Sequence, residues 1–242
     1  MTATSHPAPT PQRTIKPFTV GIIVLALSAP LITAFLDGYF DRWFDYNGSV
    51  LAGLTSFWLI VALVVWLSRL DTPPAASDAR RSWWQTFNFK RPKLRESLIV
   101  LIIAFVTLGL ANVAFVILAR TVLPTEIKVS RAVSLPLPLV ILAFLTGAIA
   151  EEILYRGYAL ERLHAMTGNW WLSGIVTGAI FAGFHFPAYP LAHIFGYILP
   201  STIVLTLIYI WKRNLTYTVM FHAVLNLPIL LGALLLPLLS PK

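Results

Sequence analysis

Apolar residues fill seven long stretches of the chain, and short polar segments separate them. A helix needs about 20 mostly apolar residues to cross the hydrocarbon core of a bilayer. The stretches lie at about 18–36, 49–67, 97–119, 138–160, 170–188, 191–211 and 215–236. The last contains Pro228, so it is either one kinked helix or a helix with a short re-entrant tail. The pattern predicts an all-α fold, a polytopic transmembrane helix bundle with seven spans, or eight if the last stretch is divided.

The composition supports a membrane protein. Of the 242 residues, 57% are hydrophobic and 12% are charged, and the mean hydropathy is +0.77. A soluble domain carries about 25% charged residues, so we expect an integral, multi-pass membrane protein. The chain has no cysteine, which excludes disulfides, zinc–thiolate sites and thiol nucleophiles.

Basic residues predict the orientation of the chain in the bilayer. The net charge is +8, and seven of the basic residues lie in the linker 68–96. The positive-inside rule places this linker, and with it the N-terminus, on the cytoplasmic side. Because loop orientation accounts for the basic residues, we expect membrane lipids around the protein and no nucleic-acid partner. The expected location is the cell (inner) membrane.

The sequence divides into three parts. Residues 1–16 are rich in Pro and Thr and are predicted to be a disordered tail. Residues 17–134 contain the N-terminal spans and the basic linker, in which the segment SWWQTFNFKRPK is expected to lie on the lipid headgroups. Residues 135–242 form the expected helical core, and they carry the polar motifs considered next.

Polar residues inside the predicted spans form three short motifs. Ionisable residues at membrane depth are rare, usually face the protein interior, and indicate a functional site by default. The motifs are E-E-x-x-x-R at Glu151, Glu152 and Arg156, F-x-x-x-H at Phe181 and His185, and H-x-x-x-N at His222 and Asn226. Four-residue spacing places both members of a pair on one face of a helix. Arg156 can therefore neutralise Glu152 and leave Glu151 available for chemistry.

The predicted topology allows the three motifs to meet in the cytoplasmic half of the bilayer. Glu151 lies near the cytoplasmic end of its predicted span, and His185 and His222 are expected at similar depths. A carboxylate removed from water is a stronger base, and beside an imidazole it could deprotonate a water molecule. A second histidine and an amide could donate hydrogen bonds to a developing oxyanion. These are the parts of a peptidase that has no serine or cysteine nucleophile.

Structural interpretations compete for several of these residues. A buried Glu152–Arg156 pair could simply join helices. His6, His164 and His193 stand outside the motifs, and we interpret them as packing or interfacial residues. Trp170 and Trp171 are interpreted as an interfacial anchor.

The three motifs, present here as EEILYR, FAGFH and HAVLN, resemble the signature of the CPBP family of CAAX-processing and bacteriocin-processing intramembrane proteases. The resemblance covers about residues 135–230. It implies that Glu151 and His185 activate a water molecule and that His222 and Asn226 form an oxyanion hole, with Glu152 and Arg156 in support. The family resembles the type II CAAX prenyl endopeptidase, whose helices enclose a cavity open to the cytosol. The substrate would be a peptide or protein, with lipidated and membrane-tethered forms among the candidates.

Three other hypotheses remain open from the sequence. In a zinc-dependent protease Glu151, His185 and His222 would hold the metal, but Glu152 would then be the base although Arg156 is placed to neutralise it. We therefore expect no cofactor. A non-catalytic scaffold or immunity protein would need no Glu151 in lipid. A transporter with a Glu151–His185 proton relay would predict an inverted repeat, and the first half of the chain has no matching interrupted helix.

Overall fold

The structure of the protein is a computed structural model that describes residues 16–71, 86–126 and 131–239. Of these residues, 85% are helical and none lies in a β-strand. The all-α prediction is therefore confirmed. The predicted tail 1–16, except for its last residue, and the part 72–85 of the linker lie outside the described residues.

Six helices in the described ranges are long and apolar enough to cross a membrane. Three are single α-helices before residue 130: α1 (Pro17–Phe40), α2 (Tyr46–Asp71) and α4 (Leu94–Thr121). The fourth, Leu137–Thr167, consists of α5 (Leu137–Leu145), the π-helices η2 (Thr146–Glu151) and η3 (Ile153–Leu160), and α6 (Glu161–Thr167). The fifth consists of α8 (Leu191–His193), the π-helix η4 (Ile194–Ile198) and α9 (Leu199–Lys212). The sixth is α10 (Leu215–Leu239), and a short 3₁₀ helix, η1 (Arg131–Ser134), precedes α5.

The predicted span at 170–188 is wrong in length. The helix α7 (Trp170–Gly183) has 14 residues, about 21 Å at 1.5 Å per residue, which is too short for a hydrocarbon core of about 30 Å. The sequence explains the early end, because Pro187 and Pro190 lack backbone N–H donors and disfavour helix in the residue before each of them. The last span is one helix that continues through Pro228 to Leu239, so the described residues give no eighth span.

The fourth span is longer than predicted, and this changes the position of Glu151. The helix continues beyond residue 160 to Thr167, so Glu151 lies near its middle and not near its cytoplasmic end. The added turn carries charges that have partners: Glu161 pairs with Arg213 at 2.7 Å, and Arg162 pairs with Asp71 at 3.3 Å. Because these charges are paired, the helix can continue through them.

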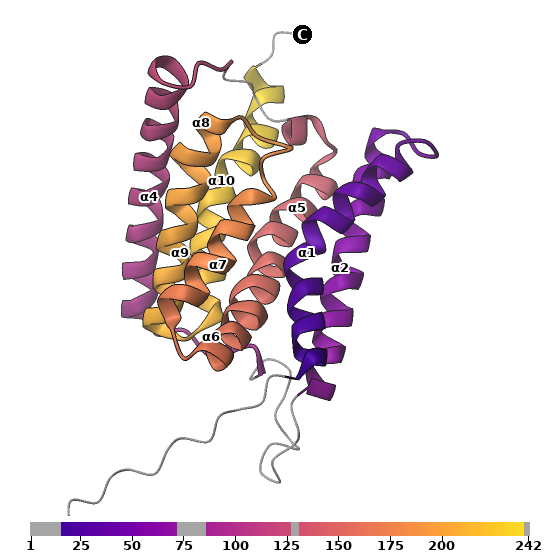
Figure 1. The fold of residues 1–242 in the computed structure, drawn as a ribbon. Coiled ribbons are helices and arrows are strands. Elements are labelled where there is room, and N and C mark those ends of the chain that lie inside the picture. Colours follow the sequence, from indigo (N-terminus) through magenta and orange to yellow (C-terminus); the bar gives the residue numbers. More distant parts are fainter. Residues whose placement is uncertain (1–15, 72–85, 127–130, 240–242) are drawn as a thin grey trace, which may run out of the picture.

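Figure 1 shows the α1–α2 hairpin along one side of the bundle and α4 along the opposite side, with the other helices between them. Two hydrogen bonds tie the hairpin to the long fourth helix. The Tyr155 hydroxyl donates to the Leu27 carbonyl at 3.0 Å, and the Trp58 indole donates to the Thr146 hydroxyl at 2.9 Å. The hairpin therefore packs directly against the π-helical segment that carries the E-E-x-x-x-R motif.

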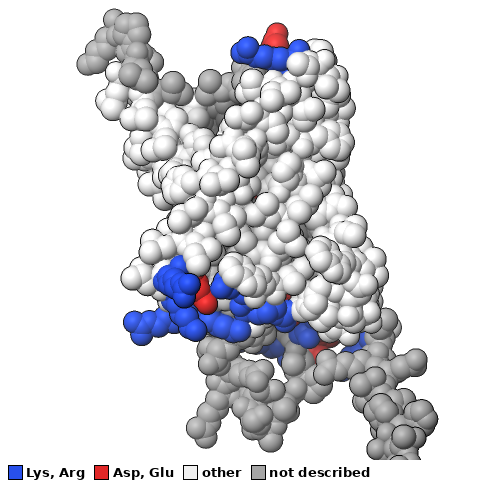
Figure 2. All heavy atoms as spheres, turned by 90° about the vertical axis from the view of Figure 1, so that its left-hand side faces the viewer, with Lys and Arg blue, Asp and Glu red and all other residues white. Residues whose placement is uncertain are grey.

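On the outer face shown in Figure 2, charged residues lie at the ends of the bundle. Figure 2 shows a broad uncharged band between them, with most Lys and Arg side chains of this face gathered at one end. The described basic residues next to the start of α4 are Lys90, Arg91, Lys93 and Arg95. The positive-inside rule would make this end cytoplasmic.

In the described end of the linker, residues 86–96, Phe87 is buried and Asn88 and Phe89 are half-buried, whereas residues 90–93 are exposed. The described aromatic part of the segment expected on the headgroups therefore packs inside the protein. Phe87 is 1% exposed, and its ring lies so close to Gly157 that a side chain there would be 3.1 Å from it. The Asn88 carbonyl accepts from the Leu215 backbone N–H at 2.9 Å, and the Asn214 side chain accepts from the Lys90 N–H at 3.1 Å. These bonds fix the start of α10, the helix that carries His222.

Candidate active site

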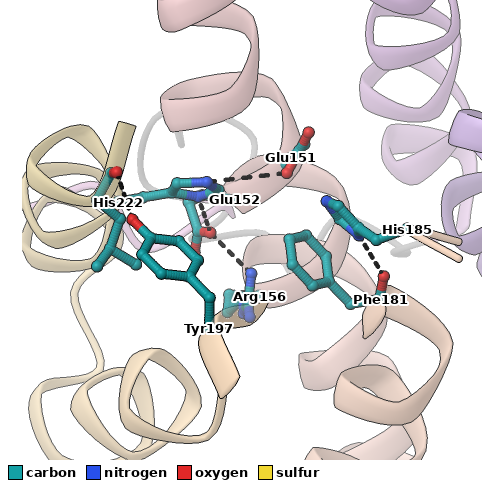
Figure 3. A network of polar contacts seen from close by, with 8 residues as sticks. Glu151, Glu152, Arg156, Phe181, His185, Tyr197 and His222 are labelled. Carbon is teal, nitrogen blue, oxygen red and sulfur yellow. Dashed lines mark hydrogen bonds and ion pairs between the residues drawn. The ribbon is translucent and has the colours of Figure 1, made fainter. Parts of the chain in front are cut away.

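The E-E-x-x-x-R motif lies where two π-helices meet, and residues of the other two motifs surround it (Figure 3). π-Helices have i→i+5 hydrogen bonds and occur frequently at functional sites. His185 follows the end of α7, and His222 and Asn226 lie one turn apart on α10. The irregular backbone around His185 is a further sign of a site, because such backbone at membrane depth is tolerated only inside protein or beside a water-filled cavity.

Glu152 is the carboxylate of the site that forms an ion pair with an arginine. Its side chain is 0% exposed, and its Oε1 accepts from the Arg156 guanidinium at 2.7 Å. The same oxygen lies 2.9 Å from Nδ1 of His222. The sequence-based pairing of Glu152 with Arg156 is thus present, although the helix is π and not α. A carboxylate bound to a guanidinium is ionised and can only accept, so Nδ1 of His222 is the donor.

Glu151 has few contacts by comparison. Its nearest described ionic partner is His222, with 3.9 Å between Oε2 and Nε2, which is too long for a hydrogen bond. The side chain of Glu151 is 21% exposed, although it lies in the middle of a spanning helix. His222 therefore stands between the two carboxylates, with one ring nitrogen toward each (Figure 3).

His185 is held by its own motif. Its Nδ1 lies 2.7 Å from the Phe181 carbonyl, and its ring packs on the Phe181 ring at 4.7 Å. A carbonyl only accepts, so Nδ1 donates, and in neutral His185 the other nitrogen, Nε2, is an acceptor. Glu151 and His185 form no direct hydrogen bond with each other. Figure 3 shows His185 on the other side of Glu151 from His222.

Asn226 lies against Gly147, a residue that belongs to none of the three motifs. A Cβ atom on Gly147 would lie 2.7 Å from the Asn226 amide nitrogen and 4.0 Å from Oε1 of Glu151. The Asn226 amide therefore lies directly against the bare backbone of Gly147, one helical turn before Glu151. A glycine at this position indicates close approach of another group, but only the fold identifies that group.

An aromatic column behind the site was missed by the motif analysis, although its period is visible in the sequence. Phe181, His185, Tyr189, His193 and Tyr197 follow one another at four-residue intervals, and their rings pack in series with centroid distances of 4.7, 5.8, 4.7 and 5.0 Å. The hydroxyl at the end of the column, on Tyr197, donates to the Leu225 carbonyl at 2.7 Å. Leu225 directly precedes Asn226, so the column connects the two sides of the site.

Two of the histidines interpreted as packing residues have that role here. His193 stacks between two tyrosines of the aromatic column and meets the edge of the Phe115 ring at 4.9 Å. His164 stacks on Trp170 at 3.5 Å. His6 lies outside the described residues.

The arrangement of side chains does not fit a metal site. Among the described residues there is no group of three His, Cys, Asp or Glu side chains that could hold a metal ion. The alternative ligand set of Glu151, His185 and His222 is therefore not gathered around one point. The described site instead offers a carboxylate with unused acceptor capacity, two oriented imidazoles and an amide.

The matched family agrees with these features. Residues 133–228 match the family described as Type II CAAX prenyl endopeptidase Rce1-like. No curated protein and no solved structure matches the chain. The matched segment contains all three motifs, and it confirms the resemblance noted for about residues 135–230. The chain is thus a multi-pass membrane protein in which residues 133–228 are similar to the family described as Type II CAAX prenyl endopeptidase Rce1-like.

Proposed function

We propose that the protein is an intramembrane endopeptidase that hydrolyses a peptide bond with a water molecule activated by Glu151. One observation carries the proposal, and it concerns two adjacent glutamates in the middle of a spanning helix. Glu152 is fully buried and bound to Arg156, whereas Glu151 is partly exposed and has no short hydrogen bond to any residue that the structure describes. An ionisable group at this depth is costly, and an unpaired one indicates function more than stability.

In the proposed mechanism Glu151 takes a proton from the water, and the resulting hydroxide attacks the carbonyl carbon of the peptide bond. Nε2 of neutral His185, free to accept because Nδ1 is held by Phe181, accepts the water's other hydrogen and orients its lone pair. Glu151 then transfers its proton to the leaving amine when the C–N bond breaks. The products are a carboxylic acid and an amine, the acid then gives its proton to the amine to form a carboxylate and an ammonium group, and no acyl-enzyme forms.

The oxyanion of the tetrahedral intermediate would accept hydrogen bonds from Nδ2 of Asn226 and Nε2 of His222. Nδ1 of His222 already donates to Glu152, so Nε2 can donate only when the ring carries protons on both nitrogens. Glu152 and Arg156 therefore support His222 and take no direct part. The family name suggests a prenylated peptide as the substrate.

The test uses purified protein in lipid vesicles with two probes, a farnesylated peptide that ends in a CAAX sequence and the same peptide without the lipid. Wild-type protein should release the C-terminal fragment of at least one probe, and Glu151→Gln should not, because an amide cannot accept the proton. If neither probe is cleaved, peptides that co-purify with Glu151→Gln but not with wild-type protein provide the second assay. Wild-type protein that cleaves neither probe while Glu151→Gln traps no peptide would favour a scaffold.

Metal dependence is tested on the same preparation. We propose that the reaction needs no metal, so zinc measured by elemental analysis should be well below one per chain and activity should survive EDTA. One tightly held zinc per chain, with activity lost on its removal and regained on its return, would overturn the glutamate mechanism.

We also propose that the linker and the N-terminus are cytoplasmic. Because the chain has no cysteine, single cysteines can be introduced at Ser77 and Asn47. An impermeant thiol reagent applied to intact cells should label the cysteine at 47 and not the one at 77. Equal labelling of both would refute the orientation.

A further inference from the structure

An amide side chain lies on the outer surface of α4, at a depth where lipid tails are expected. Asn112 is exposed, and it lies between the ends of the 28-residue helix Leu94–Thr121, nine residues before its end. Nine residues span about 14 Å, so Asn112 lies inside a hydrocarbon core of about 30 Å centred on the helix. Its Nδ2 donates to the Leu108 carbonyl of its own helix at 2.7 Å. Its Oδ1 has no partner among the residues that the structure describes.

The surface around Asn112 is suited to close contact with another helix. Gly109 lies one turn before Asn112, and nothing lies within 4 Å of the position that a Cβ atom would take on it. The exposed neighbours on this surface are apolar, and they include Ile102, Phe105, Val106 and Val113. We call these residues, with Gly109 and Asn112, the α4 outer face. Figure 2 views the molecule from the side on which α4 lies in Figure 1, and the middle of that side is uncharged.

We propose that the α4 outer face binds the same face of a second copy of this chain, with the two Asn112 amides hydrogen-bonded to each other. In membranes, helices associate through small residues that let backbones approach and through polar side chains that bond across the interface. Gly109 provides the first feature and Asn112 the second. The two residues lie on adjacent turns of one face, so a single helix crossing uses both.

Membrane topology supports a second copy of this chain as the partner of the α4 outer face. All copies of a multi-pass protein have the same orientation in the bilayer, so a twofold axis along the membrane normal brings identical residues to the same depth. An amide carries both a donor and an acceptor. Two Asn112 side chains can therefore make reciprocal hydrogen bonds without any added charge. Lipid tails offer no such partner, and a different protein would need its own polar group at this depth.

Cysteine crosslinking in native membranes tests the contact. The chain without native cysteine receives one cysteine, Val113→Cys, next to Asn112 on the α4 outer face. Oxidation should give a disulfide-linked dimer, because facing residues near the axis come within the roughly 7 Å between Cα atoms that a disulfide allows. The matched control is Leu59→Cys on the spanning helix α2, because Leu59 and Val113 are similarly exposed, at 66% and 57%. The control should give no dimer.

Three variants test whether association of the two copies depends on the Asn112 amide and on Gly109. In a dilution series in vesicles, measured by energy transfer between labelled copies, Asn112→Leu should weaken association about tenfold, or about 1.4 kcal/mol, as expected for losing two membrane hydrogen bonds. Asn112→Gln keeps the amide and should retain most of the association. Gly109→Leu should weaken it by keeping the helices apart. All three changes lie on the outer surface, and an unchanged elution volume of the monomer would confirm folding.

The proposal fails if the Val113→Cys protein crosslinks no more than the Leu59→Cys control, or if Asn112→Leu associates as strongly as wild-type protein. It also fails if the cysteine at 113 crosslinks to a different protein and not to a second copy. None of these readouts depends on proteolytic activity.

Discussion

Glu151 and Glu161 lie on the same long helix and expose nearly the same fraction of their side chains, 21% and 20%. Their hydrogen bonding differs completely. Glu161 accepts from the Tyr209 hydroxyl at 2.5 Å, from the Asn88 amide at 3.1 Å and from Arg213 at 2.7 Å. Among the described residues, the polar contact recorded for the Glu151 side chain is the 3.9 Å approach to His222. Exposure therefore does not distinguish these two carboxylates, whereas the number of hydrogen bonds that they accept does.

The largest expected effect contrasts the two glutamates directly. Glu151→Gln should lower the rate of cleavage by more than about 10³, because the proposed base is lost, while the melting temperature in detergent stays close to that of wild-type protein. Glu161→Gln should lower the melting temperature and retain most of the activity. The comparison breaks if Glu151→Gln remains nearly fully active with a verified substrate.

The second contrast concerns the two arginines that pair with glutamates on this helix. Arg156→Ala leaves the fully buried Glu152 without its guanidinium and should cost about 3–5 kcal/mol of stability. Arg213 is 36% exposed, so Arg213→Ala should cost about 1 kcal/mol or less through the ion pair. Expression level and unfolding in detergent measure both. A stable but inactive Arg156→Ala protein would instead assign Arg156 a part in the reaction.

A third prediction tests whether the absence of a side chain at Gly147 positions Asn226. In Gly147→Ala the new methyl group would lie 2.7 Å from the Asn226 amide nitrogen and should displace it. Removing one oxyanion donor costs about 10²–10³ in rate, so we expect a loss of about 10² in kcat. Gly109→Ala, where a Cβ has no neighbour within 4 Å, is the matched control and should remain active. Equal activity of the two variants would remove Asn226 from the proposed oxyanion hole.

The smallest effect is expected from the aromatic column. Tyr197→Phe keeps the ring and removes the bond to the Leu225 carbonyl, so it tests positioning and not packing. We expect kcat to fall about threefold to tenfold with little change in KM, since one neutral hydrogen bond contributes about 1 kcal/mol. A change in KM alone would mean that Tyr197 contacts the substrate.

The sequence was sufficient for features that depend on local spacing. The spans follow from the lengths of the apolar stretches, and the Glu152–Arg156 pair follows from four-residue spacing, which tolerates the change from α- to π-helix. Pro187 and Pro190 indicate that α7 ends early, although the apolar run continues past Gly183.

Other features depend on which elements face each other, and no single-chain pattern determines this. The position of His222 between Glu151 and Glu152 depends on how α10 packs against the long helix. The contact of Asn226 with Gly147 has the same origin. The hydrogen bond from Tyr197 joins segments 28 residues apart. Sequence reasoning selected the polar residues of the site but not their neighbours.

The π-helical segment from Thr146 to Leu160 implies an unusual sensitivity to chain length. Its i→i+5 hydrogen bonds accommodate more residues in a turn than an α-helix does. If one residue before Gly147 were removed, the π-helical segment could relax toward α-helical geometry. The side chains that follow the deletion would then each move by one position, which is a rotation of about 100° around the helix axis. Glu151 would then leave His222, and Glu152 would take its place. An insertion or deletion in this segment should therefore abolish activity, so that its length is as much a part of the site as its carboxylates.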